Sequence, residues 1–139
     1  MITAVDTSVI IDILEPDPVY GPMSREALRT CLREGTVVAS SIVWAEVATA
    51  YGQISQDAVD AMNELSIGYV TIRQDSALTA AQHWFEYRQQ GGRRERIVAD
   101  FLIGAHAVVQ CDRLLSRDRG FYRSYFTSLS LIHPAQPSP

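Results

Sequence analysis

Hydrophobic residues along this chain fall into short β-branched runs and longer stretches with helical spacing. Residues 2–5 form the first run, Asp6 ends it, and a second apolar stretch follows over residues 9–14. A β-branched run that ends in an acid and hydroxyl residues predicts a buried strand leading into a helix that begins near Thr7 or Ser8. Asp6 is therefore expected at the carboxyl end of the first strand, the edge where open α/β sheets bind ligands.

The rest of the chain repeats this alternation of strands and helices. Further strands are expected at residues 36–39, 68–72, 113–116 and 129–132. Helices are expected at residues 24–34, 42–51, 55–65, 75–90 and 97–110, with a short one before the last strand. Ser24 is the expected N-cap of the first of these. Such alternation indicates a parallel sheet covered on both faces. The predicted fold class is α/β, a single-domain three-layer α/β/α arrangement with a central, mostly parallel sheet of four to five strands.

Length and composition favour one compact domain. The chain has 139 residues, 47% of them hydrophobic, and we expect a domain over residues 1–133 followed by a proline-rich C-terminal tail at 134–139. No apolar run approaches the roughly 20 residues of a membrane helix. The first residues contain no basic segment or cleavage site, so we expect a cytoplasmic protein with no membrane partner. Cys31 and Cys111 lack the spacing of a disulfide framework or a metal site and are expected to be buried thiols.

The charged residues narrow the possible chemistry. The formal net charge is −4, which argues against a general polyanion-binding surface. All 12 basic residues are arginine, and the chain contains no lysine. This excludes a phosphate-binding loop that needs a lysine. It also disfavours a receiver-like phospho-switch or an aspartate-nucleophile phosphatase, both of which usually have a lysine near the phosphoryl group.

Four acids occur at comparable places in the predicted fold. Asp6 ends the first strand, Glu46 and Asp100 lie early in apolar helices, and Asp118 follows the fourth strand. Burying a lone carboxylate costs several kcal/mol unless something compensates its charge, and no arginine lies within the apolar stretches. We therefore expect the acids to face one another across a pocket and to bind divalent cations. Hard oxygen ligands suit Mg²⁺ or Mn²⁺, and such ions support phosphodiester hydrolysis.

Each acid also has a structural explanation. Asp6 could be a helix N-cap, Glu46 could reach solvent at the edge of its helix, and Asp100 could complement the helix dipole. Asp118 lies between two arginines and could form a surface ion pair. Asp12 lies nearly two helical turns beyond Asp6 and is expected to point away from the site.

Basic residues near Asp100 could hold RNA phosphates. Arg93, Arg94 and Arg96 precede the helix that carries Asp100. Arginine contacts to phosphate fix the position of a nucleic acid. A solvated loop explains the same residues about equally well.

Four segments together resemble one known family. They are AVDTSVIIDIL at residues 4–14, SSIVWAEV at 40–47, ADFLIGAHA at 99–107 and LLSRDRGF at 114–121. Their order and spacing resemble those of the motifs in PIN-domain ribonucleases. Within that family the chain is similar to the VapC-type toxins of bacterial toxin–antitoxin pairs. The resemblance covers essentially the whole chain.

The resemblance implies a function and a set of site residues. Asp6, Glu46, Asp100 and Asp118 would be metal-binding and catalytic acids, holding one or two Mg²⁺ or Mn²⁺ ions. Ser116 matches a position often held by threonine, and it keeps the hydroxyl. The expected activity is metal-dependent endoribonuclease cleavage of an RNA substrate, with inhibition by a small cognate antitoxin protein and a homodimeric toxin. The alternative is a catalytically silent PIN-like module that binds RNA or a protein without cleaving it.

Overall fold

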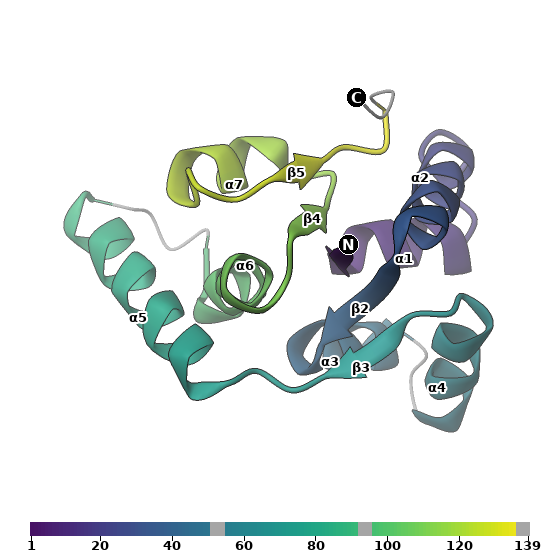
Figure 1. The fold of residues 1–139 in the computed structure, drawn as a ribbon, viewed down its shortest axis with the longest axis horizontal. Helices are drawn as coiled ribbons and strands as arrows, with labels where there is room; N and C mark the ends of the chain where they lie inside the picture. Colours follow the sequence, from purple (N-terminus) through teal and green to yellow (C-terminus); the bar gives the residue numbers. More distant parts are fainter. Residues whose placement is uncertain (51–54, 92–95, 136–139) are drawn as a thin grey trace.

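One parallel sheet forms the centre of the molecule. The computed structural model describes residues 1–50, 55–91 and 96–135. Within them the strand order is β3-β2-β1-β4-β5, and every neighbouring pair is parallel (Figure 1). The strands are β1 (Ile2–Val5), β2 (Thr36–Ser40), β3 (Gly68–Val70), β4 (Arg113–Leu115) and β5 (Leu131–Ile132). The predicted α/β class is confirmed, and the sheet is wholly parallel.

Helices lie on both sides of this sheet (Figure 1). They are α1 (Thr7–Leu14), α2 (Gly21–Glu34), α3 (Ser41–Ala50), α4 (Ser55–Glu64), α5 (Gln74–Gln89), α6 (Val98–Gln110) and α7 (Arg119–Tyr125). Helix α5 packs against α6, and α1 packs against α2 and α3. In the described part of the chain, no helix has the length and apolar character needed to cross a membrane.

The central strands are apolar because they are buried on both faces. Val5 in β1 and Leu114 in β4 are almost inaccessible to solvent, as are Val9 and Ile10 in α1 and Phe101 in α6. Burial of each such side chain contributes about 1.5–3 kcal/mol. Parallel strands covered by helices therefore appear in the sequence as continuous β-branched runs rather than alternating ones.

Strand β1 marks the point at which the order of the strands reverses. The chain runs outward from β1 through β2 to β3 and then returns to place β4 on the other side of β1. The main-chain N–H of Asp6 donates to the carbonyl of Leu115 at 2.9 Å, which extends the pairing of β1 and β4 to the carboxyl end of both strands. Open α/β sheets bind ligands beyond the carboxyl ends of the strands at such a switch point.

The boundaries of the second helix correct one expectation. The helix begins at Gly21, three residues before the predicted cap, and Pro22 occupies its first turn, where a proline is tolerated. Ser24 is therefore not an N-cap. It is buried inside the helix, and its hydroxyl donates to Asp12. The local sequence contains the cap residue type, but the contact with α1 decides how the hydroxyl is used.

Several other predicted boundaries differ by one or two residues. The third and fifth strands are shorter than expected, ending at Val70 and beginning at Leu131. Tyr51, the predicted end of a helix, and tail residues 136–139 lie outside the described residues. Cys31 is buried and Cys111 is partly buried, and both thiols are free.

Candidate active site

Asp6 lies at the switch point and is held by three donors. As the N-cap of α1, it accepts a hydrogen bond at Oδ1 from the Thr7 N–H at 2.8 Å. Its Oδ2 accepts from the hydroxyls of Ser116 at 2.7 Å and Tyr122 at 3.3 Å. Burial raises the pKa of Asp6, and the charge of Glu46 raises it further. Asp6 forms no ion pair with an arginine among the described residues, although only 9% of its surface is exposed.

Glu46 approaches Asp6 through a shared neighbour. The Thr7 hydroxyl donates to Glu46 Oε1 at 2.7 Å, so a residue of α1 fixes a carboxylate of α3. Glu46 is solvent-exposed, although its helix is apolar in sequence. The argument from the cost of burial therefore does not apply to Glu46, because an exposed carboxylate keeps its hydration. Glu46 is assigned to the site because it binds Thr7, the residue that follows Asp6.

Asp100 lies in the first turn of α6. Its Oδ2 accepts the N–H of Ile97 at 3.0 Å, so the carboxylate caps the helix that carries it. Asp100 is half-buried and forms no arginine ion pair among the described residues. A helix N-terminus stabilises a carboxylate, and capping leaves the second oxygen, Oδ1, available for another partner.

Asp118 joins the site from the loop after β4. Its N–H donates to the Ser116 hydroxyl at 3.0 Å, and that hydroxyl in turn donates to Asp6. The Asp118 carboxylate has a cationic partner, since Arg96 Nη1 lies 2.6 Å from Oδ2. The Arg96 guanidinium also lies over the ring of Phe121, 4.4 Å from its centroid. The ion pair considered for Asp118 therefore exists, but with Arg96 and not with its neighbours in sequence.

Tyr122 is a site residue that the sequence did not identify. The side chain is 2% exposed, and its hydroxyl donates to Asp6. Burial raises its pKa well above the ordinary value, and the charges of Asp6, Asp100 and Asp118 raise it further. Acids that follow β1, begin α6 and follow β4 are thus near enough for their charges to act on one phenol. In sequence, the tyrosine lies within an aromatic cluster that resembles core, and its place one helical turn after Asp118 was the available signal.

The predicted basic loop is only partly described. Arg93 and Arg94 lie outside the described residues. Arg96 is half-buried against Asp118 and Phe121. The sequence left open whether Arg96 holds RNA phosphates or lies in a solvated loop, and in the structure its guanidinium places a positive charge beside Asp118.

The donor chemistry of the site fits a hard divalent cation. The available groups are carboxylate and hydroxyl oxygens, the ligands that Mg²⁺ and Mn²⁺ prefer. Asp6 is buried without a cationic partner, which is costly unless a positive charge approaches it. Within the described residues, however, no three acids, histidines or cysteines lie close enough together to hold a metal ion as they stand. A metal would therefore require these side chains to rearrange.

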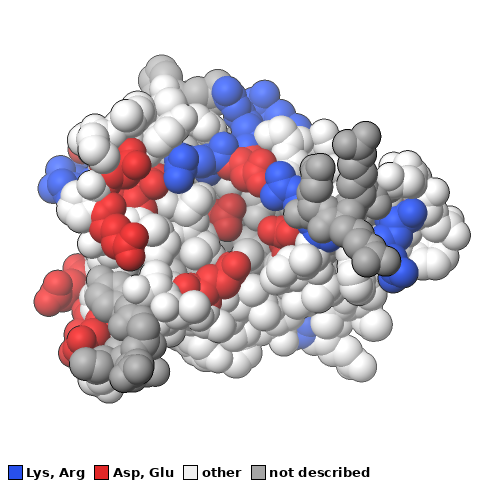
Figure 2. All heavy atoms as spheres, turned by 180° about the vertical axis from the view of Figure 1, so that it is seen from behind, with Lys and Arg blue, Asp and Glu red and all other residues white. Residues whose placement is uncertain are grey.

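The surface carries a concentration of acidic groups. On the face opposite to that of Figure 1, aspartate and glutamate side chains gather near the middle, and arginine side chains lie beside them (Figure 2). Such a surface attracts cations and repels a nucleic-acid backbone unless cations neutralise it.

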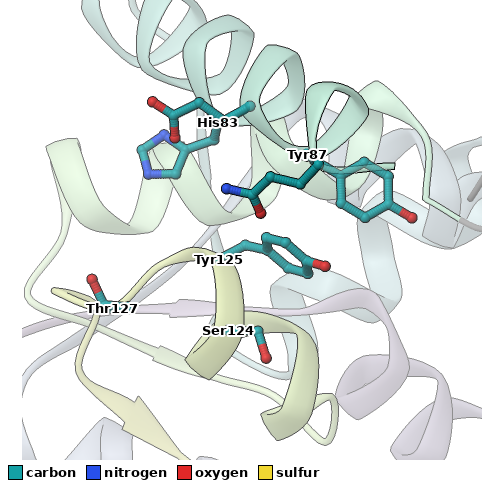
Figure 3. A pocket seen from close by; sticks show the side chains of 7 residues that line it. His83, Tyr87, Ser124, Tyr125 and Thr127 are labelled. Carbon is teal, nitrogen blue, oxygen red and sulfur yellow. The ribbon is translucent and has the colours of Figure 1, made fainter. Parts of the chain in front are cut away.

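A separate pocket lies between α5 and the end of α7 (Figure 3). Its volume is about 210 Å³, and polar side chains form most of its lining. The His83 ring stacks on Phe126 with centroids 4.6 Å apart, and Tyr87 meets Tyr125 edge to face at 5.1 Å. None of the four predicted acids lines this pocket, so it is distinct from the group around Asp6.

Comparison with known proteins identifies the family to which this chain belongs. The sequence pattern of the PIN domain family matches residues 3–126, which is most of the chain. The chain therefore belongs to the PIN domain family, as the four sequence motifs predicted. No curated protein matches the chain in sequence.

Solved structures share this fold over nearly their whole length. One is VapBC2 from Rickettsia felis bound to a DNA fragment of its promoter, with a TM-score of 0.76 and 17% identity over 96% of this chain and 98% of the other. VapBC-1 from nontypeable Haemophilus influenzae has a TM-score of 0.74 and 20% identity, and the match covers 98% of this chain and 100% of the other. FitAcB from Neisseria gonorrhoeae has a TM-score of 0.70 and 23% identity, and the match covers 99% of this chain and 100% of the other. Identities this low demonstrate a common fold.

Proposed function

We propose that this protein is a metal-dependent endoribonuclease that acts as the toxin of a toxin–antitoxin pair. The observation that carries the proposal is the chain of hydrogen bonds from Asp6 through Ser116 to Asp118, which lies at the switch point of a PIN fold. A site rich in oxygen ligands, at the place where α/β sheets bind ligands, suits phosphodiester hydrolysis. The notable absence of lysine disfavours phosphoryl-transfer enzymes that rely on it.

The site residues would have two roles, metal binding and orientation of a metal ligand. Asp6, Glu46, Asp100 and Asp118 would hold one or two Mg²⁺ or Mn²⁺ ions. Divalent cations in such sites lower the pKa of water and neutralise charge on the leaving oxygen. Ser116 and Tyr122 donate to Asp6 Oδ2 and so fix the orientation of that carboxylate.

The biological role rests on the proteins that share the fold. VapBC complexes from several bacteria match 96–98% of the chain, and two of them were solved with DNA. By analogy with these complexes, this chain would bind a small cognate antitoxin, form a homodimer and act on RNA in the cytoplasm. Expression in bacteria should then arrest growth, and the Asp6→Asn variant should not.

A second function is favoured by one specific observation. Arg96 pairs with Asp118 at 2.6 Å, and no three acids among the described residues converge at ligating distance. A guanidinium that permanently replaced the cation would leave a PIN-like module that binds RNA or a protein without cleaving it.

Cleavage of purified RNA with Mg²⁺ or Mn²⁺ separates the two functions. The wild-type protein should cleave, EDTA should stop the reaction, and Asp6→Asn should abolish it. Asp57→Asn is the matched control, because Asp57 is an exposed aspartate of α4 outside the site. Attack by water leaves a 5′-phosphate and a 3′-hydroxyl, whereas a contaminating nuclease that uses the 2′-hydroxyl leaves a cyclic phosphate. Full activity of Asp6→Asn, or cleavage in EDTA, would refute the nuclease assignment.

A further inference from the structure

We propose that Asp12 and Arg117, here called the anchor pair, are positioning residues that fix the β4–α7 loop and thereby set the cation affinity of the site. The role in cation binding rests on the proposed function. Asp12 is in α1, the helix that Asp6 caps, and Arg117 lies between Ser116 and Asp118. The sequence places Asp12 away from the acids, and its contacts reveal a different use.

The anchor pair is closely surrounded by other groups. Arg117 Nη2 donates to Asp12 Oδ1 at 3.0 Å, and Arg117 Nε lies 2.8 Å from Oδ2 without the alignment of a hydrogen bond. The buried hydroxyl of Ser24 donates to Oδ2 at 2.9 Å. The ring of Tyr20 lies beneath the guanidinium, 4.2 Å from its carbon to the ring centroid. Charge, hydrogen bonding and stacking therefore hold Arg117 in one orientation.

Burial makes this contact more restrictive than a surface ion pair. The Asp12 side chain is 5% exposed and that of Arg117 is 32% exposed. Water competes poorly for a carboxylate that is nearly inaccessible, so the carboxylate depends on the guanidinium and on Ser24. An exposed pair would leave the loop free to move, because such pairs contribute little.

The loop is attached to α1 at two points. Ser116 donates to Asp6 at the start of the helix, and Arg117 pairs with Asp12 further along it. One attachment allows the loop to rotate about it, whereas two attachments fix its orientation. Asp118 follows directly, and its N–H donates to Ser116. Two contacts thus fix the main chain just before Asp118, whose carboxylate itself pairs with Arg96. Supporting residues preorganise a binding site in this way.

An ion pair at the opposite end of β4 provides a matched control. Arg113 begins β4 and pairs with Glu34, with side-chain exposures of 9% and 40%. Arg113 also donates to Thr3 in β1 at 2.8 Å. This pair joins the amino end of β4 to its surroundings, whereas the anchor pair follows the carboxyl end. Breaking either pair should lower stability, but only the anchor pair should affect the site.

The test compares Asp12→Asn and Arg117→Lys with Glu34→Gln and Arg113→Lys. Hydrogen exchange of the Asp118 amide, followed by NMR at a temperature where all the proteins are folded, reports on the loop without metal or RNA. Exchange should be at least about tenfold faster in both anchor variants and unchanged in both controls. The dissociation constant for Mn²⁺ should rise by about tenfold or more in the anchor variants alone, as for other residues that support metal ligands. Arg117→Lys retains the charge, so it provides a folded variant if Asp12→Asn does not fold.

The outcomes separate this proposal from the proposed function. Unchanged exchange at Asp118 in the anchor variants, or an equal change in the controls, overturns the positioning role. Faster exchange with unaltered Mn²⁺ affinity overturns its link to the site. If the wild-type protein binds no Mn²⁺, the nuclease proposal fails, and hydrogen exchange still decides whether the anchor pair fixes the loop.

Discussion

The Ser116 hydroxyl donates to Asp6 Oδ2 at 2.7 Å and joins residues 110 positions apart in sequence. Ser116 follows β4 and Asp6 follows β1, and the two strands are neighbours only because the chain returns to β1 after forming the other half of the sheet. The same hydroxyl accepts the N–H of Asp118. One small side chain therefore connects two of the four candidate acids.

The first prediction concerns this hydroxyl. Ser116→Ala removes the donor to Asp6 and the acceptor for Asp118, so RNA cleavage should fall by about 10- to 100-fold. Ser116→Thr should retain much of the activity because it keeps the hydroxyl. Ser128→Ala, an exposed serine after α7, is the control. Equal activity of the alanine and threonine variants would show that the hydroxyl is not needed.

The second prediction follows from the raised pKa of Asp6. Because the folded-state pKa lies above 3.8, the folded protein binds this proton more tightly than the unfolded chain. Stability is therefore lost as the pH rises from about 3.8 through the raised pKa. In EDTA at pH 7, Asp6→Asn should melt a few degrees above the wild type, since asparagine is also a good N-cap. The difference should vanish as the pH approaches 4.

Thermal unfolding across this pH range, with Asp57→Asn as the control, measures the effect. Added Mn²⁺ should raise the melting temperature of the wild type and leave that of Asp6→Asn unchanged, because ligands that bind the folded state stabilise it. A lower melting temperature for Asp6→Asn at pH 7 in EDTA would contradict the assignment of a buried, uncompensated charge.

The third prediction addresses Arg96. Its guanidinium occupies the Asp118 carboxylate, so Arg96→Gln should lower the Mg²⁺ concentration needed for half-maximal cleavage. If Arg96 also contacts RNA phosphates, as its sequence position indicates, the KM for RNA should rise several-fold with less effect on kcat. Arg29→Gln, an exposed arginine of α2, is the control. A lower Mg²⁺ requirement together with a higher KM for RNA distinguishes this role from a loss of folding, which would not improve the response to Mg²⁺.

The fourth prediction tests the packing that places α6, the helix of Asp100. A Cβ atom at Gly104 would lie 2.6 Å from ring atoms of Phe126, which is buried and stacked on His83. Gly104→Ala should therefore destabilise the fold by about 1–3 kcal/mol. At Gly120 nothing lies within 4 Å of the added atom, so Gly120→Ala should be neutral or stabilising by up to about 1 kcal/mol. Chemical denaturation measures both, and similar effects at the two glycines would contradict the packing.

Local patterns were sufficient to predict the elements and the position of Asp6. β-branched runs favour strands, periodic apolar residues favour helices, and the parallel order follows from their alternation. The same patterns gave a wrong role to Ser24, because its hydroxyl contacts a residue of another helix. They also suggested burial of Glu46, which is exposed, because a helix with few charges can still present one side chain to solvent.

The fold class and the family could be determined from the sequence by itself, because these depend on residue type, spacing and order. The sequence also proposed four acids as site residues, and that proposal stays a prediction. Only the tertiary structure decided that Arg96 neutralises Asp118, that Tyr122 lies among the acids and that Asp12 holds Arg117. Each of these contacts joins residues that are far apart in the chain. Their distances depend on how helices and strands pack, and hydrophobic periodicity within one segment carries no information about such distances.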